Sequence, residues 1–378
     1  MENFTAYNPV KLLFGQGVTG QMSNNLHSFG KRVLFLYGKG SIKNNGIYDE
    51  VIQELKLAGK EVYEFSGIKP NPSVTDARRA VRICSEKQID LILAVGGGSV
   101  IDTAKAVAIS APEKLDPWEV FTRKVKPSKA LPVIAVLTLA ATGTEMNMFS
   151  VIQNEEINEK IGFGVPLMYP KQSYLDPAFT RTVSKEYTAF GIVDLIAHAL
   201  ENYFGSGEAT LADRYVFSIV NEAIEIADPL LADPDNYDLR ARMMWAATNA
   251  LNGYTNYGRK SGDFAVHALG HSISALFDTP HGATLSIIYP AWLKFISAIV
   301  PERLVKLGEV VFNDASIDGC INGLTNLFRS LNSPVTLEEA QIVGKDREIL
   351  KQLWINTKAA GYTYEISTVD YDRILSLI

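Results

Sequence analysis

The sequence predicts an α/β domain built on a parallel sheet, followed by an all-α domain. The chain has 378 residues, more than the roughly 250–300 at which a single hydrophobic core stops growing. Its first half alternates short apolar runs with helical stretches, as expected for a parallel sheet covered on both faces. From about Ser184 onward the pattern is long and amphipathic at helical spacing. We therefore expect domains over residues 1–180 and 181–378.

Each element of the first domain is predicted from a short segment. Strands are expected at the apolar runs 31–38, 60–67, 90–96 and 131–139. Helices are expected at 46–58, 73–88 and 100–111. Ser73, with Asp76 three residues on, provides a capping-box-like start for the second of these helices.

The second domain shows no alternating strand pattern and is predicted to be nearly all helical. Helices are expected at 185–204, 210–231, 238–253, 262–277, 300–312, 317–331, 336–354 and 367–378. The seam between the domains is expected between Asp176 and Ser184.

Composition excludes several classes of protein. The net charge of −6 argues against a nucleic-acid surface. The two cysteines, Cys84 and Cys320, cannot form a disulfide framework or a thiolate zinc site, and they fit a reducing compartment. The N-terminus lacks a signal-peptide pattern, and the apolar stretches fall short of the ~20 residues that span a bilayer. We expect a cytoplasmic protein with neither a membrane nor a nucleic-acid partner.

Four of the five histidines fall in two short clusters. Asp194 and His198 share a helix face, as do His267 and His271, because each pair is spaced by four residues. His281 follows in a Thr-Pro-His-Gly turn that can aim it back at the helix. Hydrogen-bonded core histidines are the alternative, but the joint pattern favours one divalent metal, Fe²⁺, Zn²⁺ or Mn²⁺. Not all five of these residues need be metal ligands. His271 is the one expected to support a ligand or to relay a proton instead.

Two loops that follow predicted strands are candidates for binding a dinucleotide. Gly97, Gly98 and Ser99 open a predicted helix, where bare backbone amides and the helix dipole favour a pyrophosphate. Thr138 and Thr142 lie in a second loop whose hydroxyls could bind adenine, ribose or phosphate. Each loop alone is also consistent with an ordinary turn. Together they predict a crevice at the carboxyl ends of two strands, where α/β sheets bind ligands.

The loop at 38–43 bears on the choice of coenzyme. It offers Gly38, Ser41 and two lysines, and no acidic residue occurs between Lys31 and Tyr48. An acidic side chain near this strand end would bind the ribose hydroxyls of NAD, whereas hydroxyl and positive charge suit the 2′-phosphate of NADP. The alternative is a solvated basic loop. If a dinucleotide binds, NADP(H) is expected.

The spacings Asp194-x3-His198 and His267-x3-His271-x9-His281 occur together with GGGSVIDTAK at 96–105, TLAATGTE at 138–145 and the opening FTAYNPVKLLFGQG. This set resembles the iron-activated (group III) alcohol dehydrogenases over nearly the whole chain. The segments at 37–49 and 281–295 are most similar to the NADPH-dependent butanol dehydrogenase and aldehyde reductase branch. The resemblance implies a Rossmann-like first domain in a dehydroquinate synthase-like architecture. It also implies a homodimer, paired through a strand near 4–7.

The resemblance further implies roles for individual residues. Asp194, His198, His267 and His281 would ligate Fe²⁺ or Zn²⁺, and His271 would lie beside the substrate. The implied cofactor-binding residues are Gly38, Ser41, Asn71, Gly97, Gly98, Ser99, Asp102, Thr138, Thr142, Asn147 and Lys160. Two residues depart from the family pattern: Ala140 stands where many members have proline, and Phe264 where relatives often have tryptophan.

The resemblance implies reversible reduction of short-chain aldehydes, such as butanal, to primary alcohols by hydride transfer from NADP(H). The metal would stabilise the developing alkoxide, and His271 would supply the proton. One alternative is a dehydroquinate-synthase-like lyase that uses nicotinamide transiently, but few Arg or Lys residues lie beside the ligands in the sequence. The other is a non-enzymatic metal- or nucleotide-binding protein, although nothing in the chain resembles an output module.

Overall fold

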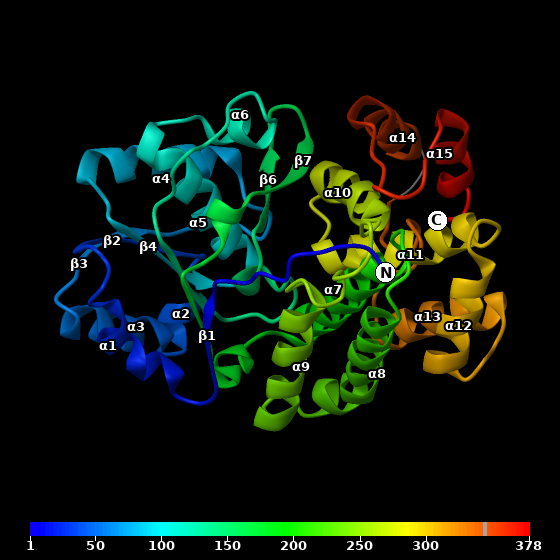
Figure 1. The fold of residues 1–378 in the computed structure, drawn as a ribbon, viewed down its shortest axis with the longest axis horizontal. Coiled ribbons are helices and arrows are strands. Elements are labelled where there is room, and N and C mark those ends of the chain that lie inside the picture. Colours follow the sequence, from blue (N-terminus) through cyan, green and yellow to red (C-terminus); the bar gives the residue numbers. More distant parts are fainter. Residues whose placement is uncertain (343–345) are drawn as a thin grey trace. The chain divides into compact units, whose positions relative to one another are not determined.

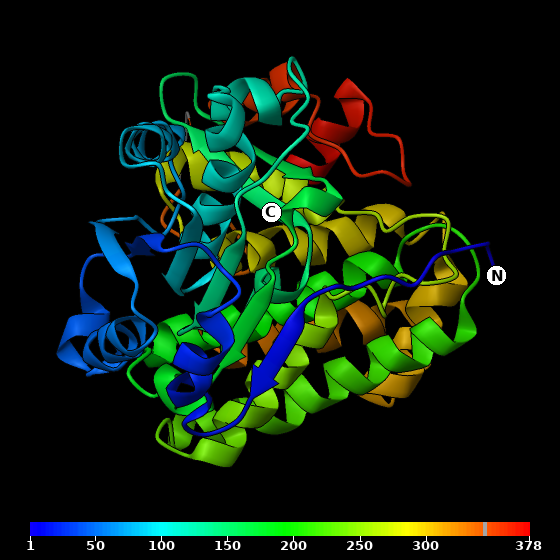
Figure 2. The same cartoon turned by 60° about the vertical axis from the view of Figure 1, so that its left-hand side comes forward.

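Six parallel strands form the sheet that the sequence predicts. They are β1 (Lys11–Phe14), β2 (Arg32–Tyr37), β3 (Glu61–Phe65), β4 (Leu91–Gly96), β5 (Val133–Leu137) and β8 (Gln172–Leu175). Their order across the sheet is β1-β8-β5-β4-β2-β3, and every neighbouring pair is parallel. The sequence does not predict β1 and β8, because four-residue strands are too short to show a pattern; β1 lies at the sheet edge (Figure 2).

The computed structural model describes residues 1–342 and 346–378. The chain divides into two units (Figure 1). The sheet unit comprises Tyr7–Val183 and Asp235–Met244, and the helical unit comprises Met1–Ala6, Ser184–Pro234 and Trp245–Ile378.

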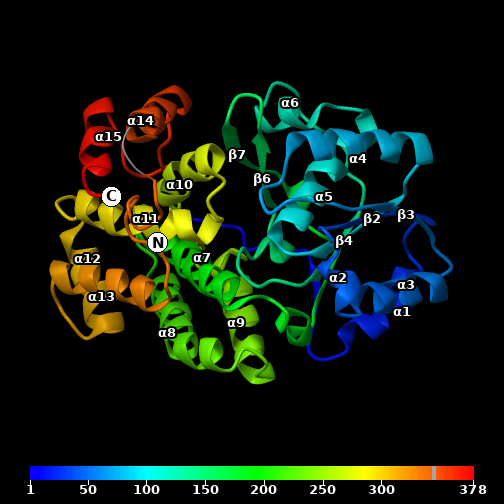
Figure 3. The same cartoon turned by 180° about the vertical axis from the view of Figure 1, so that it is seen from behind.

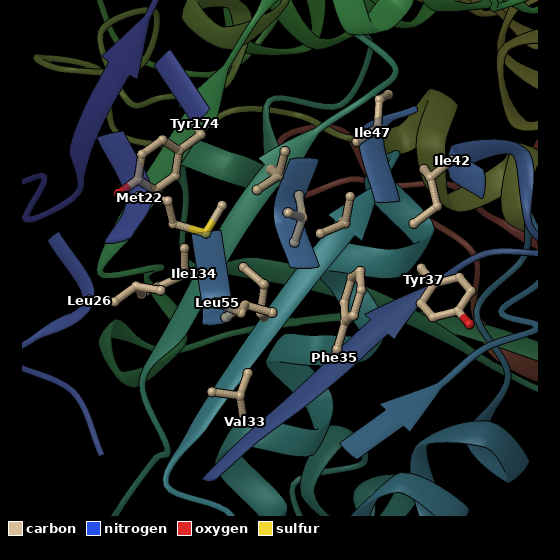
Figure 4. Packing of buried hydrophobic residues seen from close by; sticks show 14 of the residues in the cluster. Met22, Leu26, Val33, Phe35, Tyr37, Ile42, Ile47, Leu55, Ile134 and Tyr174 are labelled. Carbon is tan, nitrogen blue, oxygen red and sulfur yellow. The ribbon is translucent and has the colours of Figure 1, made fainter. Parts of the chain in front are cut away.

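Helices cover both faces of the sheet (Figure 3). On one face lie α1 (Met22–Leu26), α2 (Ser41–Asn44) and α3 (Ile47–Leu57), and on the other α4 (Val74–Lys87) and α5 (Gly98–Ser110), against which α6 (Pro117–Phe121) packs. The first face holds a hydrophobic core in which Val33 and Phe35 of β2 meet Leu55 of α3 and Met22 of α1 (Figure 4). Burial of both faces explains why the central strands are apolar throughout.

The strand order places three loops at the ligand-binding edge of the sheet. From β2 the chain moves outward to β3, whereas β4 lies on the other side of β2 and is followed by β5. The loops after β2 and β4 therefore leave the sheet at its topological switch point, where open α/β sheets bind ligands. The segment after β5 leads into an antiparallel hairpin, β6 (Phe149–Asn154) and β7 (Glu159–Gly164), which packs on α5.

The helical unit agrees with the predicted all-α second domain. Its helices are α7 (Lys185–Tyr203), α8 (Thr210–Ala232), the second half of α9 (Tyr237–Ala250), α10 (Ala265–Phe277), α11 (His281–Ile296), α12 (Pro301–Phe312), α13 (Ile317–Ser330), α14 (Asp346–Thr357) and α15 (Thr368–Leu375). Helix α11 packs against α7, α10 and α13 and is buried nearly all round, which accounts for its apolar sequence. None of the helices formed by the described residues is long and apolar enough to span a bilayer.

Three details differ from the prediction. Of the helix predicted at 336–354, residues 336–341 form turns and bends and α14 begins only at Asp346, while 343–345 lie outside the described residues. Ser73 caps α4 by accepting from the backbone N–H of Thr75, but Asp76 pairs with Arg79 at 3.1 Å. Residues 4–7 form no strand in the single chain, where the first strand is β1.

Candidate active site

The helical unit brings together three of the four predicted metal ligands. Asp194 lies within α7, His267 in the first turn of α10, and His281 is the first residue of α11. Each offers one ligand atom, and these atoms lie within 4.8 Å of one another. Asp194 Oδ1 is 3.7 Å from Nε2 of both histidines. His281 thus lies at the start of a helix rather than in the predicted turn, and this helix start brings it to Asp194 and His267.

His198, the fourth predicted ligand, lies beside this group. Its Nδ1 is 3.3 Å from Asp194 Oδ1, one helical turn earlier, and its ring stacks on that of His267 with centroids 4.5 Å apart. Burial lowers the pKa of His198 to about 4, against the attraction of Asp194, so the ring is neutral and able to ligate a cation at neutral pH.

The polar atoms of this cluster fit a divalent cation. Asp194, His198 and His267 are all more than nine-tenths buried. Among the described residues, Asp194 Oδ1, His198 Nδ1 and His267 Nε2 have no hydrogen-bond partner. Leaving such atoms buried and unsatisfied is costly, and a cation would satisfy all three. One carboxylate and imidazoles suit Fe²⁺ or Zn²⁺ better than Mg²⁺ or Ca²⁺. Against the effect of burial, Asp194 and Glu201 raise the pKa of His267 to about 9, so a cation bound there would displace a proton from this ring.

His271, the predicted proton donor, lies at the rim of the cluster. Its ring centroid is 5.5 Å from that of His281 and 6.4 Å from that of His267. The side chain is partly exposed. This position suits a group that exchanges protons with solvent next to the ligands.

Glu201 is a buried residue of this cluster that lies outside the predicted set of ligands. Its Oε1 accepts from the backbone N–H of His267 at 3.0 Å and lies 3.1 Å from Nδ1 of the same residue. The sequence spacing does indicate this residue, because Asp194, His198 and Glu201 follow the i, i+4, i+7 pattern of one helix face.

In the sheet unit, the two predicted nucleotide loops pack against each other. Gly97 is the N-cap residue of α5 and makes no side-chain cap, so the helix N-terminus offers bare amides. A Cβ added at Gly98 would lie 2.8 Å from Oγ1 of Thr142, and one added at Gly97 would lie 3.2 Å from Cβ of Leu139. Thr138 donates its backbone N–H to the carbonyl of Gly96 at 3.0 Å. Glycine is thus required for the close approach of the two loops.

A buried lysine outside the predicted set of cofactor-binding residues holds the second loop. Lys105 of α5 is fully buried, and its Nζ donates to the carbonyls of Thr144, Asn147 and Phe149 at 2.6, 2.9 and 2.7 Å. Burial lowers the pKa of Lys105 to about 8, although Asp102 and Glu145 oppose the shift. The ammonium group therefore closes the loop that carries Thr142 and Asn147.

The remaining predicted cofactor residues are engaged in contacts within the sheet unit. Asp102 accepts from Thr144 Oγ1 at 2.6 Å and from the backbone N–H of Val151 at 2.9 Å. Lys160 of β7 donates to Asn71 Oδ1 at 3.0 Å. These contacts join α5, the loop before α4 and the β6–β7 hairpin into one framework.

Other predicted residues also have partners within the chain. Asn147 accepts from Lys105 at 3.2 Å and from the backbone N–H of Phe149 at 2.9 Å. The hydroxyl of Ser99 donates to the carbonyl of Pro70. Gly38 accepts from the backbone N–H of Gly67 at 3.1 Å.

Strand β3 places an acidic residue next to the loop at 38–43, although that loop itself contains none. Glu64 accepts from the hydroxyls of Tyr37 and Tyr48, each at 2.6 Å, and lies 3.7 Å from Nζ of Lys43. Lys43 also lies over the ring of Tyr48, 4.5 Å from its centroid. Ser41, the first residue of α2, is exposed beside this cluster. The sequence does not indicate this contact, because α3 and most of β3 separate Glu64 from the loop in the chain.

Comparison with known proteins agrees with this architecture. The model of the family described as iron-containing alcohol dehydrogenase matches residues 9–177, and that of the Fe-containing alcohol dehydrogenase family, C-terminal, matches 188–378. The chain is 40% identical to the probable NADH-dependent butanol dehydrogenase 1 of Bacillus subtilis, over 100% of this chain and 99% of that protein. It is 36% identical to the NADPH-dependent aldehyde reductase YqhD of Escherichia coli, over 93% of each.

A solved structure is similarly close. The crystal structure of NADH-dependent butanol dehydrogenase A from Thermotoga maritima superposes with a TM-score of 0.96 at 38% identity, covering 100% of this chain and 98% of that one. The dehydroquinate synthase-like fold implied by the sequence is therefore confirmed. The chain belongs to the iron-containing alcohol dehydrogenase family, in its butanol dehydrogenase and aldehyde reductase branch.

Proposed function

We propose that this alcohol dehydrogenase interconverts short-chain aldehydes and primary alcohols, such as butanal and butanol, with one divalent metal and a nicotinamide coenzyme. The observation that carries the proposal is the convergence of Asp194, His267 and His281 within 4.8 Å in a chain of this family. The names of the B. subtilis and T. maritima relatives support butanol as substrate, and the name of the E. coli relative supports aldehydes more broadly.

Asp194, His267 and His281 would hold the metal, with His198 as the fourth ligand after a small adjustment of its ring. Bound there, the cation would polarise the carbonyl oxygen of the aldehyde while the reduced nicotinamide supplies the hydride. Asp194 and Glu201 are both buried carboxylates, and their attraction for a divalent cation is stronger in a buried site than in water.

His271 would donate a proton to the product oxygen and accept one in the reverse direction. Its ring lies beside that of His281 and is open to solvent on one side, so the proton it gives up can be replaced from water.

For the coenzyme we propose NADH, with the NADPH predicted from the sequence as the alternative. The prediction of NADPH rests on positive charge near Ser41, but Lys43 is paired with Glu64. A carboxylate beside the ribose loop disfavours a 2′-phosphate by like-charge repulsion. The names of the B. subtilis and T. maritima relatives support NADH, whereas that of the E. coli relative supports NADPH.

The test is net coenzyme oxidation by purified, iron- or zinc-loaded protein with a panel of linear aldehydes from two to eight carbons. Stoichiometric loss of NADH or NADPH with formation of the alcohol supports the proposal. A dehydroquinate-synthase-like lyase would give no net oxidation, and a binding protein would give no turnover. Either of those results would contradict the proposed reaction.

A further inference from the structure

Glu201 lies behind the candidate metal centre, on the side of His267 away from Asp194. The side chain is fully buried, and it projects from α7 on the same face as Asp194 and His198. A single oxygen of its carboxylate, Oε1, faces both the backbone N–H and the ring Nδ1 of His267. Burying a carboxylate without a cation beside it is costly, so its placement here calls for a compensating role.

The first contact replaces a missing helix cap. The N-cap residue of α10 is Phe264, which has a left-handed φ of 64° and no side-chain acceptor. His267 is the third residue of α10, and its N–H is one of those that a capping side chain normally satisfies. Glu201 accepts this N–H from another helix, and its own carbonyl accepts from the N–H of Asp263 at 2.9 Å. The start of α10 is thereby fixed to α7.

The second contact fixes the ring. When Nδ1–H of His267 donates to Glu201, the lone pair of the neutral ring is on Nε2, the atom that lies 3.7 Å from Asp194 Oδ1. An imidazole that donates to a carboxylate is also a more basic ligand. The corresponding atom of His198, Nδ1, lies 3.3 Å from Oδ1 of Asp194, which is itself a candidate ligand rather than an outer partner.

We propose that Glu201 is a positioning residue for the metal centre: it sets the rotamer and the tautomer of His267 so that Nε2 faces the metal. The proposal rests on the metal site assigned above. It predicts that Glu201 controls metal affinity without touching the metal, and that its loss costs affinity by the 10–100-fold typical of such outer partners.

The experiment measures metal affinity rather than activity. Chelator-stripped full-length protein is titrated with Zn²⁺ in competition with a chromophoric chelator, for wild type and Glu201→Gln. The amide keeps the size and one acceptor of the carboxylate but not its charge. We expect the Kd of Glu201→Gln for Zn²⁺ to rise by about 10–100-fold, with an unchanged far-UV circular dichroism spectrum. A Kd within twofold of wild type would overturn the proposal.

Asp263→Asn is the matched control. Asp263 is a fully buried carboxyl group of the same unit, and burial and the nearby Glu201 raise its pKa to about 8. Its Oδ1 accepts from the backbone N–H of Thr363 at 3.2 Å rather than from a ligand ring. We expect its Zn²⁺ affinity to stay within twofold of wild type. An equal loss in both variants would mean that any change to a buried carboxyl group of this unit weakens metal binding, and the assignment to Glu201 would fall.

Two further arms separate this inference from the proposed metal site. If wild type binds no Zn²⁺, or His281→Ala binds it as tightly, the metal site itself fails and the inference with it. If Glu201→Gln does not fold, ¹⁵N-histidine spectra of the zinc-loaded wild type determine the tautomer of His267. The signals of His267 are assigned by comparison with a His267→Asn sample. A proton on Nδ1 of His267 supports the proposal, and a proton on Nε2 overturns it.

Discussion

Oδ1 of Asp194 lies 3.7 Å from Nε2 of His281, although α7 and the first turn of α11 are far apart in sequence. We expect His281→Ala to lose bound metal, since it removes one of only three atoms in the tight group. Its affinity for Fe²⁺ or Zn²⁺ should fall by more than about 100-fold, beyond the effect of an outer partner. Plasma emission analysis of protein purified without added metal checks this. His27→Ala, which removes the one histidine outside the two clusters, should retain wild-type metal content.

Metal removal should also destabilise the helical unit. A ligand that binds only the folded state at 100 times its Kd adds about 2.7 kcal/mol to the free energy of unfolding. Stripping the wild type with a chelator should therefore lower its Tm, and restoring Zn²⁺ should recover it. In His281→Ala the same treatment should leave Tm unchanged. Equal shifts in the two proteins would contradict the assignment of the ligands.

His271→Gln should separate proton transfer from metal binding. General acid–base groups contribute about 10²–10⁴-fold to rate, so we expect kcat for butanal reduction to fall by at least about tenfold, with water as a partial substitute. Metal content should match wild type, because the ring of His271 lies outside the group of ligand atoms. Loss of metal in this variant would instead make His271 a ligand.

Glu64→Gln tests the coenzyme proposal. Removing the carboxylate frees Lys43 and lowers repulsion toward a 2′-phosphate, so the ratio of kcat/KM for NADPH over NADH should rise. Because Glu64 and Lys43 are both partly exposed, the expected change is modest, up to roughly fivefold. Glu61→Gln makes the same charge change at the other end of β3 and should leave the ratio unaltered. An unchanged ratio in Glu64→Gln would show that Glu64 does not select the coenzyme.

Gly98→Ala should weaken coenzyme binding, because the new methyl group would lie 2.8 Å from Oγ1 of Thr142 and force the two loops apart. Calorimetry with NADH or NADPH should show a Kd raised by roughly tenfold, the effect of about 1.4 kcal/mol. Gly20→Ala, where an added Cβ meets no atom within 4 Å, is the control and should bind as wild type. Tight binding by Gly98→Ala would remove this helix start from the nucleotide site.

Lys105→Met should destabilise the sheet unit, because three backbone carbonyls lose a fully buried donor. The expected cost is about 3 kcal/mol at pH 7 from urea denaturation. The pKa of Lys105 is lowered to about 8 in the folded chain, against 10.5 for an ordinary lysine. Between those values the unfolded chain holds a proton that the folded chain has released, so raising the pH through this window favours folding of wild type but not of the variant.

Lys60→Met provides the comparison for Lys105. Lys60 also donates to backbone carbonyls, those of Leu26, Phe29 and Gly30, but it is partly exposed. Water can replace its hydrogen bonds, so the cost should be smaller. Equal destabilisation by the two variants would contradict the role of burial at Lys105.

The sequence alone determined the order of elements wherever local pattern is strong. Apolar runs such as 91–96 form central strands because both of their faces are buried, and the spacing of Asp194 and His198 fixes them on one helix face. The same information paired His267 with His271 and located the glycines at the start of α5. These features depend on residues close together in the chain, whose relative positions follow from helix and strand geometry.

Only the tertiary structure decided which distant residues meet. Glu201 meets His267 because α7 packs beside α10, and Glu64 reaches Lys43 because β3 pairs with β2. Lys105 reaches the loop after β5 through the packing of α5 on the sheet. Strand β8, four residues long, exists because β5 and β1 flank it. Each of these contacts joins elements whose arrangement depends on packing of the whole unit, and no local periodicity encodes it.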